Sequence, residues 1–234
     1  MKVGIMQPYF VPYIGYWQLL NAVDKYVIYD DVNYINRGWI NRNRILINHQ
    51  PKYFNIPMLG ASQNKFINEI SVNNDEKLIE KNLKVVKGAY SKAPYFEECY
   101  PIIEEILSCG EENLASYLEK SIRSICRYLD IETELIRSSA LEKDCRLKGQ
   151  DKILAICELL EATEYYNAIG GQELYSYSAF EERNIQLKFL QTSDVEYVQF
   201  GNNFQPNLSI LDVMMFNPKE QIKKMLEQYR IITE

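Results

Sequence analysis

The sequence predicts an α/β fold, a doubly wound and mostly parallel sheet with a β-hairpin insertion at about 43–57 and a helical insertion at about 75–130. Two observations support this prediction. The chain opens with an apolar strand at 2–6, a helix at 13–23 and a β-branched, aromatic strand at 26–30, which make a β-α-β start. Later strand patterns alternate with helical ones, which favours parallel strands joined by right-handed connections.

The other elements are predicted from local patterns. Runs at 43–47 and 52–57 flank a turn that contains His49 and Pro51, a composition typical of a hairpin. From about 75 to 130, apolar residues recur at three- and four-residue spacing, which indicates helices with one buried face. The remaining expected elements are a short strand at 69–72, a helix that opens at Ala93-Pro94-Tyr95-Phe96, strands at 134–137, 165–169 and 186–190, a helix at 150–162 and a Lys-rich helix at 219–228.

Length and charge limit the class of protein. The 234 residues are enough for one domain, 1–234, with its own core. The formal net charge of -6 argues against a general nucleic-acid partner, because such partners need a positive surface. No apolar run approaches the roughly 18 residues that cross a bilayer, and the N-terminus lacks a signal-peptide pattern. We therefore expect a cytoplasmic protein without membrane insertion.

Cysteine and histidine usage excludes several chemistries. The five cysteines are odd in number and form no Cys-x-x-Cys pair, so the sequence predicts reduced thiols and neither a disulfide framework nor a zinc site. The single histidine, His49, lies in the predicted hairpin turn. Catalytic Ser-His-Asp and Cys-His sites and multi-histidine metal sites are excluded on this count. We expect no resident metal and no permanently bound cofactor.

Polar residues or glycines come after each predicted strand of the sheet. In an open parallel sheet, ligands bind outside the carboxyl ends of the strands. Loops are polar by default, so the pattern favours a shared site without proving one. These residues are Gln7 and Tyr9 after the first strand, Asp30 and Asp31 after the second, Ser138 and Ser139 after the third, Gly170 and Gly171 after the fourth, and Gln191 and Thr192 after the fifth.

The segment 30–44 has the highest density of chemically useful side chains. Paired carboxylates such as Asp30 and Asp31 can raise one another's pKa into the range of a general base. Arginines of this segment can hold a phosphate or carboxylate through paired hydrogen bonds. The alternative is an ordinary salt-bridged loop that leads into the hairpin. Gly170 and Gly171 could let the backbone approach a phosphate or sugar, or could form a turn without a ligand.

Motifs along nearly the whole chain resemble the WbqC-like protein family. One departure lies after the fourth strand, where members often have Ser-Gly-Pro-Gly-Gly and this chain has Asn167-Ala168-Ile169-Gly170-Gly171. The matching segments are Gln7-Pro8-Tyr9-Phe10-Val11-Pro12-Tyr13-Ile14-Gly15-Tyr16, Tyr29-Asp30-Asp31-Val32, Arg37-Gly38-Trp39-Ile40-Asn41-Arg42-Asn43-Arg44-Ile45, Tyr90-Ser91-Lys92-Ala93-Pro94-Tyr95-Phe96 and Phe204-Gln205-Pro206-Asn207-Leu208-Ser209-Ile210-Leu211-Asp212.

The resemblance implies a role in bacterial O-antigen or other surface-polysaccharide biosynthesis. The motifs fall on the strand-end positions and extend the candidate site. Its expected catalytic residues are Gln7, Asp30 and Asp31. Its expected substrate-binding residues are Tyr9, Tyr13, Tyr16, Arg37, Trp39, Asn41, Arg42, Arg44, Gly170, Gly171, Tyr175, Ser209 and Asp212.

Three functions are compatible with these residues. The first is a transferase that acylates or aminoacylates the amino group of a nucleotide-linked sugar, with Asp30 or Asp31 as the base. The second is an ATP-dependent nucleotidyltransferase or amide-forming ligase, because Tyr13-Ile14-Gly15-Tyr16 stands where the His-x-Gly-His element of that superfamily would stand; it would use Mg²⁺. The third is a non-catalytic scaffold in polysaccharide assembly. The sequence leaves the acyl, aminoacyl or ATP donor undefined.

Overall fold

The computed structural model describes residues 1–201 and 203–233, and its centre is a six-stranded sheet in the order β10-β9-β8-β1-β2-β7. All neighbouring strands pair in parallel except β10, which is antiparallel to β9. The predicted α/β class with a mostly parallel sheet is confirmed. The strands are β1 (Lys2–Met6), β2 (Lys25–Ile28), β7 (Glu134–Arg137), β8 (Glu164–Ala168), β9 (Gln186–Thr192) and β10 (Tyr229–Ile232).

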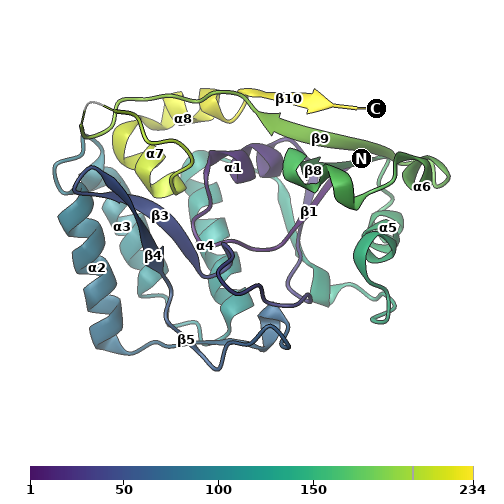
Figure 1. The fold of residues 1–234 in the computed structure, drawn as a ribbon, viewed down its shortest axis with the longest axis horizontal. Helices are drawn as coiled ribbons and strands as arrows, with labels where there is room; N and C mark the ends of the chain where they lie inside the picture. The colour runs from purple at the N-terminus through teal and green to yellow at the C-terminus, as the bar shows by residue number, and fades with distance from the viewer. Residues whose placement is uncertain (202, 234) are drawn as a thin grey trace.

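Helices cover both faces of the sheet, because side chains alternate between the faces along each strand. Tyr26 and Ile28 belong to one core, whereas Val3, Ile5 and Val27 belong to the other. In Figure 1, α4 and α7 lie on the opposite side of the sheet from α5 and α6. The first core takes in α1 (Ile14–Asn21), α4 (Leu114–Leu129), α7 (Ile210–Phe216) and α8 (Lys219–Met225), and the second α5 (Gly149–Leu159) and α6 (Tyr177–Glu181).

Both predicted insertions are present between β2 and β7. The hairpin is β3 (Arg42–Ile47) with β4 (Gln50–Asn55), and a two-residue strand β5 (Met58–Leu59) pairs with β6 (Ser71–Val72). The helical part comprises α2 (Glu76–Tyr90), α3 (Phe96–Leu107) and α4. Because α4 buries its apolar stripe in the same core as Tyr26 and Ile28, it is also the crossover helix that brings the chain back to β7.

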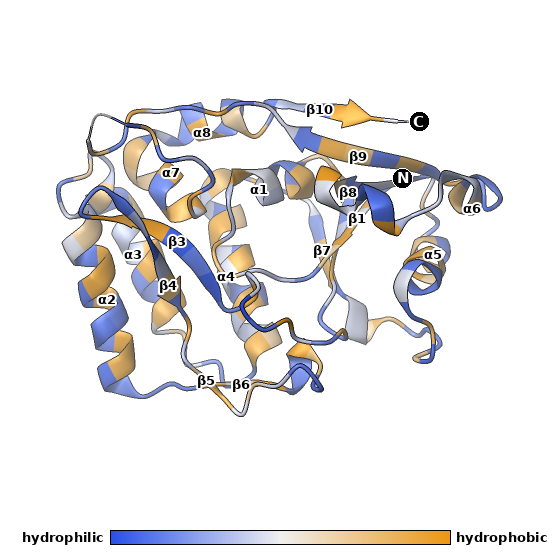
Figure 2. Ribbon diagram, viewed as in Figure 1, coloured by the Kyte–Doolittle hydropathy of each residue, from blue (hydrophilic) through white to orange (hydrophobic). Residues whose placement is uncertain are grey.

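Short 3-10 turns come after two of the strands. They are η2 (Ser138–Ala140) after β7 and η3 (Ile169–Leu174) after β8, with η1 (Ile67–Glu69) in the first insertion. Figure 2 shows α2 with a hydrophilic and a hydrophobic side, as expected of a helix with one buried face.

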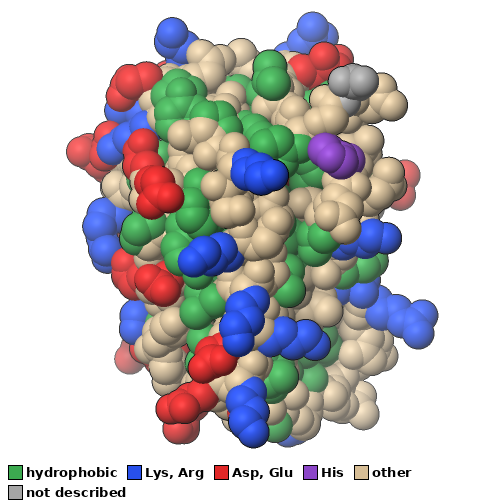
Figure 3. Space-filling model, turned by 90° about the vertical axis from the view of Figure 1, so that its left-hand side faces the viewer, with side chains coloured by type: hydrophobic (Ala, Val, Ile, Leu, Met, Phe, Trp, Pro, Cys, Tyr) green, Lys and Arg blue, Asp and Glu red, His purple; other side chains and the backbone are tan. Residues whose placement is uncertain are grey.

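The surface that carries α2 and the hairpin is shown in Figure 3. Several Lys and Arg side chains occupy it, mostly separated by uncharged side chains. Among the described residues, no helix is both long enough and apolar enough to cross a membrane.

Candidate functional site

A cavity of about 620 Å³ opens at the carboxyl ends of β1 and β8. After β1 the chain builds one side of the sheet with β2 and β7, and later the other side with β8 and β9. The strand order therefore reverses between β1 and β8, which is where open α/β sheets bind ligands. We call this space the switch-point cavity. It is lined by Ile5, Met6, Gln7, Tyr9, Tyr13, Tyr29, Val32, Trp39, Gly149, Gln150, Ile153, Asn167, Ala168, Gly170, Gly171, Leu174 and Tyr175.

A second cavity of about 360 Å³ adjoins the first and shares Tyr9, Tyr13 and Trp39 with it. Arg44 lines this second space, so we call it the Arg44 cavity. The guanidinium carbon of Arg44 lies 5.8 Å from the centroid of the Trp39 ring, which places a cation beside an aromatic face. The other residues that line the Arg44 cavity are Pro12, Asn43 and Asn207.

The loop that carries Tyr9 and Tyr13 is held by side chains from distant elements. Asn43 Nδ2 on β3 donates to the Val11 carbonyl at 3.1 Å, and Ser209 Oγ donates to the same carbonyl at 2.6 Å. Val11 itself has a positive φ of 39°, a backbone conformation that β-branched residues rarely adopt. Asn43 and Ser209 therefore fix a strained loop and, through it, the two tyrosine rings in the cavities.

Two helices begin at the switch-point cavity without a side-chain cap. Tyr13 is the N-cap of α1 and Lys148 the N-cap of α5, and neither side chain accepts a bond from its helix. Tyr13 and Gly149, the first residue of α5, both line the cavity. Backbone N–H groups at uncapped helix starts, together with the helix dipoles, attract anions. The cavity therefore offers two anion-attracting ends, and the carboxylate of Asp151 in the first turn of α5 does not line it.

Neither the switch-point cavity nor the Arg44 cavity is lined by a described Asp, Glu, Lys or His residue. Arg44 is the charged side chain there. Burial raises the pKa of the Tyr9, Tyr13 and Tyr175 hydroxyls above their ordinary value, so these groups stay protonated at neutral pH. They can donate hydrogen bonds and present ring faces, but they are poor bases.

Asp30 is fully buried at the end of β2 and does not line either cavity. Its carboxylate accepts a bond from the Ser139 backbone N at 2.9 Å and another from Ser139 Oγ at 2.6 Å. Asp30 thus joins the end of β2 to the turn after β7. Its contacts in this structure are with the fold, and its expected catalytic role stays a prediction.

Asp31 also lies outside the cavities and forms a buried cluster with two lysines. Its Oδ2 is 2.9 Å from Lys143 Nζ and 3.1 Å from Lys152 Nζ, and both lysine side chains are almost wholly buried. Burial raises the pKa of Asp31, but bonding to the Ser138 side chain and the two ammonium groups lowers it by more, so that the pKa lies below the ordinary 3.8. A raised pKa is therefore not found at Asp31, and its expected role as a general base stays a prediction.

The cluster of Asp31, Lys143 and Lys152 contacts elements that form the wall of the switch-point cavity. Lys152 lies on α5, donates to the Asp31 carbonyl at 2.8 Å and sits 5.0 Å from the centroid of the Tyr29 ring, which lines the cavity. Lys143 donates to the Ser138 carbonyl in the turn after β7. The cluster therefore fixes the start of α5 relative to β2 and β7.

Comparison with known proteins gives a family. A model of the WbqC-like protein family matches residues 7–224. The chain belongs to the WbqC-like protein family. "Uncharacterized protein Rv1507c" of Mycobacterium tuberculosis (strain ATCC 25618 / H37Rv) is 29% identical over 220 residues, which cover 92% of this chain and 93% of that protein. No solved structure matches the chain significantly.

The residues expected to be catalytic or substrate-binding divide into two groups in the structure. Those that line the two cavities are Gln7, Tyr9, Tyr13, Trp39, Arg44, Gly170, Gly171 and Tyr175. Those that lie elsewhere are Tyr16, Asp30, Asp31, Arg37, Asn41, Arg42, Ser209 and Asp212.

Members of the second group have internal partners. Tyr16 is buried in the core, where its hydroxyl donates to the Gln7 carbonyl at 3.3 Å. Arg42 donates to the Gly38 carbonyl at 3.1 Å and also to that of Arg37, so its guanidinium is already engaged. Asn41 accepts from the Tyr34 hydroxyl at 2.8 Å. Asp212 accepts hydrogen bonds from two tyrosines and a glutamine.

Sequence reasoning missed several residues that line the cavities. Gly149 and Gln150 come from the start of α5, and Asn207 comes from the loop before α7. The strand-end rule selects only residues that come directly after a strand, so it does not select a helix start that lies opposite the strand ends. Lys148-Gly149-Gln150 before a predicted helix was the available signal, because an uncapped helix start with a glycine suits an anion.

Gly15 in WbqC-like motif 7–16 occupies a position with no space for a side chain. A Cβ there would lie 2.4 Å from Thr192 Oγ1 and 2.5 Å from the Tyr13 ring. Gly15→Ala is therefore expected to lower the free energy of unfolding by about 1–3 kcal/mol, because one of these side chains must move.

Gly88 of α2 has nothing within 4 Å of its Cβ position. Gly88→Ala, the matched control, should raise the free energy of unfolding by about 0.5–1 kcal/mol. Urea unfolding of both variants checks the opposite signs, and equal stabilisation would show that Tyr13 is not packed as described.

Proposed function

We propose that this WbqC-like protein binds a nucleotide-linked amino sugar and transfers an acyl or aminoacyl group to its amine, as a step of bacterial surface-polysaccharide (O-antigen) biosynthesis. The observation that carries the proposal is the switch-point cavity, at which two uncapped helix starts and a glycine pair face a set of aromatic rings. Membership of the WbqC-like family supports a role in polysaccharide biosynthesis. The reaction itself is proposed from the residues of the site.

Each part of the ligand has a matching part of the site. The diphosphate suits the starts of α1 and α5 and the backbone at Gly170 and Gly171, where N–H groups and helix dipoles favour negative charge. The base and the sugar suit the faces of Tyr9, Tyr175 and Trp39, since flat or apolar ligand faces pack on aromatic rings. The two cavities of about 620 and 360 Å³ are in the range of pockets that enclose small ligands.

The amides of Gln7, Gln150 and Asn167 add directional hydrogen bonding to the cavity wall. They can orient a sugar or base without introducing charge. Arg44 lies in the adjoining cavity and can hold a phosphate or an acidic donor through its fork of N–H groups. Positioning of two substrates side by side is the contribution that this arrangement offers to a transfer reaction.

The alternative ATP-dependent function receives less support from the same residues. Tyr16 is buried, and the space beside Gly15 is filled by Thr192 and the Tyr13 ring. The Tyr13-Ile14-Gly15-Tyr16 segment therefore has one side chain, Tyr13, at the cavity where two phosphate-binding groups would be needed. The scaffold alternative gives no reason for the switch-point cavity.

A ligand screen tests the proposal. Melting temperatures are measured with UDP-, dTDP- and GDP-linked amino sugars, with ATP and Mg²⁺, and with acyl-CoA, because a ligand that binds only the folded state raises the midpoint. We expect stabilisation by a nucleotide sugar, and we expect Arg44→Ala to weaken its binding about tenfold or more, as for loss of a charge-assisted bond. Arg42→Ala serves as the control, since Arg42 binds backbone carbonyls. Stabilisation by ATP and Mg²⁺ alone, or by nothing in the panel, would contradict the proposal.

A further inference from the structure

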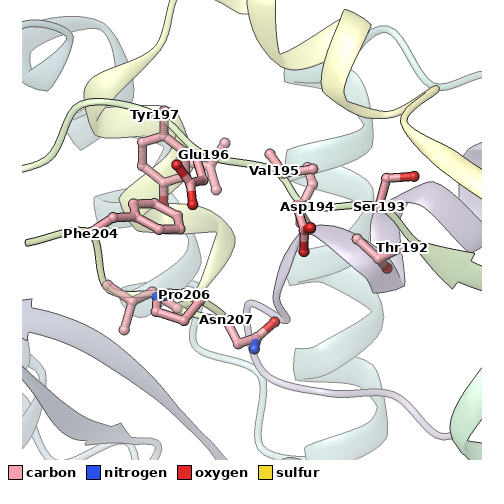
Figure 4. A pocket seen from close by; sticks show the side chains of 12 residues that line it. Thr192, Ser193, Asp194, Val195, Glu196, Tyr197, Phe204, Pro206 and Asn207 are labelled. Atoms are coloured by element: carbon pink, nitrogen blue, oxygen red, sulfur yellow. The ribbon is translucent and has the colours of Figure 1, made fainter.

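A third cavity, of about 540 Å³, lies at the carboxyl end of β9 (Figure 4). Its walls are the segment from Thr192 to Tyr197 and the segment from Phe204 to Leu208, and Ile14 of α1 and Val213 of α7 complete it. We call this space the Asp194 cavity. The function proposed above makes no use of it.

The lining of the Asp194 cavity combines carboxylates with aromatic rings. Asp194 and Glu196 supply two carboxylates, and Tyr197 and Phe204 supply rings whose centroids are 5.2 Å apart in an edge-to-face arrangement. Figure 4 shows the Glu196 carboxylate beside these rings and the Asp194 carboxylate on the same wall. The described lining includes no Lys or Arg. A carboxylate beside aromatic faces is the chemistry that recognises an ammonium group.

The two carboxylates are not used elsewhere in the described part of the fold. Within residues 1–201 and 203–233, neither Asp194 nor Glu196 has a hydrogen-bond or ion-pair partner. Asp30 and Asp212, by contrast, accept hydrogen bonds within the fold, and Asp31 is paired with two buried ammonium groups. Asp194 and Glu196 are therefore available to a ligand, whereas the carboxylates that the sequence suggested are not.

The Asp194 cavity adjoins the other two. Asn207 lines both the Asp194 cavity and the Arg44 cavity. Thr192, on the wall of the Asp194 cavity, and the ring of Tyr13, on the wall of the other two, lie within 2.5 Å of one point, the Cβ position of Gly15. A ligand with its diphosphate in the switch-point cavity would therefore reach the Asp194 cavity through the Arg44 cavity, past Asn207.

We propose that the Asp194 cavity binds the protonated amine of the acceptor sugar, and that Asp194 and Glu196 accept its hydrogen bonds. One of these carboxylates then takes a proton from the ammonium group, because only the neutral amine can attack the acyl carbon. This inference rests on the proposed function and adds the feature that selects an amino sugar over a neutral one. The groove formed by the three cavities then has anion-attracting helix starts at one end and carboxylates at the other, which fixes the direction of the ligand.

Isothermal titration with matched ligands tests the inference. Each of the UDP-, dTDP- and GDP-linked amino sugars is compared with its counterpart that has a hydroxyl in place of the amine, and with the nucleoside diphosphate alone. We expect the wild type to prefer the amine at least tenfold. The double variant Asp194→Asn, Glu196→Gln should lose this preference and keep its affinity for the nucleoside diphosphate. Glu132→Gln, an exposed carboxylate on the loop before β7, is the control and should retain the preference.

The possible results distinguish failure of this inference from failure of the proposed function. If a nucleotide sugar binds but the amine preference is absent, or survives in the double variant, the inference is overturned and the proposed function stands. Binding of Mg²⁺ that is lost in the double variant, without an amine preference, would overturn it in favour of a cation site. If none of the nucleotide sugars binds, the proposed function fails and the inference falls with it.

Discussion

Asp31→Asn is expected to lower the free energy of unfolding by about 3–5 kcal/mol, because it leaves buried ammonium groups without their counter-charge. Lys143 and Lys152 are 4% and 7% exposed, and both approach the same carboxylate oxygen at 2.9 and 3.1 Å. Neither lysine has another carboxylate within ion-pair distance among the described residues. Urea unfolding at pH 7 measures the loss.

Asp130 provides a control, because it too is paired with two lysines but lies at the surface. It also accepts bonds from two lysines, Lys219 at 2.7 Å and Lys223 at 3.3 Å, but its side chain is half exposed. Water already solvates these charges, so Asp130→Asn should change stability little. Asn also tolerates the left-handed backbone at this position, where φ is 55°. Equal effects at Asp31 and Asp130 would show that burial does not strengthen the Asp31 cluster.

The Asp31 cluster also predicts a dependence on pH. Since the folded-state pKa of Asp31 is lowered below 3.8, the folded state favours the ionised carboxylate. The stabilisation is fully present above the unfolded-state pKa near 3.8, and it is lost as the pH falls through the lower folded-state pKa. The difference in stability between wild type and Asp31→Asn should therefore be constant from pH 7 to about 5 and shrink below about pH 4. A gap that widens on acidification would contradict the assignment.

The strands and the crossover helices could be predicted because their signals are local. Apolar, β-branched and aromatic residues mark β1 and β2, and a regular apolar stripe marks α4 from residue 114 to 129. The strand β10, from Tyr229 to Ile232, was missed. It is a short edge strand with its side chains partly exposed on both faces, so its sequence shows no clear alternation. Its position is set by pairing with β9 rather than by its own pattern.

The position of the site could also be predicted from the sequence. The contacts of the charged residues Asp30 and Asp31 could not. Gln7, Tyr9, Gly170 and Gly171 come after strands that end at the switch-point cavity, as the topology requires. The partners of Asp30 and Asp31 come from the chain 109 and 121 residues later, and no local pattern indicates such contacts. Polar residues at strand ends can serve either a ligand or the fold, and in the structure the carboxylates of these two contact the fold and line neither cavity.

The closing motif shows the same ambiguity at Asp212, which was expected to bind substrate and instead forms the centre of a buried network. Its Oδ1 accepts from the Tyr90 hydroxyl at 2.8 Å, and its Oδ2 accepts from the Tyr197 hydroxyl at 2.8 Å and from Gln199 Nε2 at 2.6 Å. Tyr90 in turn accepts a bond from the Leu46 backbone N at 3.0 Å. The network joins α7, the end of α2, β3 and the loop after β9.

Asp212→Ala is expected to lower the free energy of unfolding by about 2–4 kcal/mol, because three donors would lose their acceptor in a buried place. Tyr197→Phe removes one donor and leaves the carboxylate with two, so it should cost about 1 kcal/mol. Urea unfolding of both variants and of the double variant gives their coupling. A loss below about 1 kcal/mol for Asp212→Ala would show that water replaces the network.

The same variant connects stability with recognition, because Tyr197 forms part of the Asp194 cavity while its hydroxyl bonds to Asp212. Without Asp212, nothing else in the network fixes that hydroxyl except Gln199, which donates to it at 3.2 Å. At a temperature where Asp212→Ala is folded, we therefore expect it to lose much of the preference for an amino sugar and to keep its affinity for the nucleoside diphosphate. In the proposed arrangement the diphosphate lies beyond Tyr13, at the starts of α1 and α5, and the network makes no hydrogen bond to these helix starts. Titration with the matched ligands measures both quantities, and a parallel loss of both would mean that the substitution disturbs the whole groove.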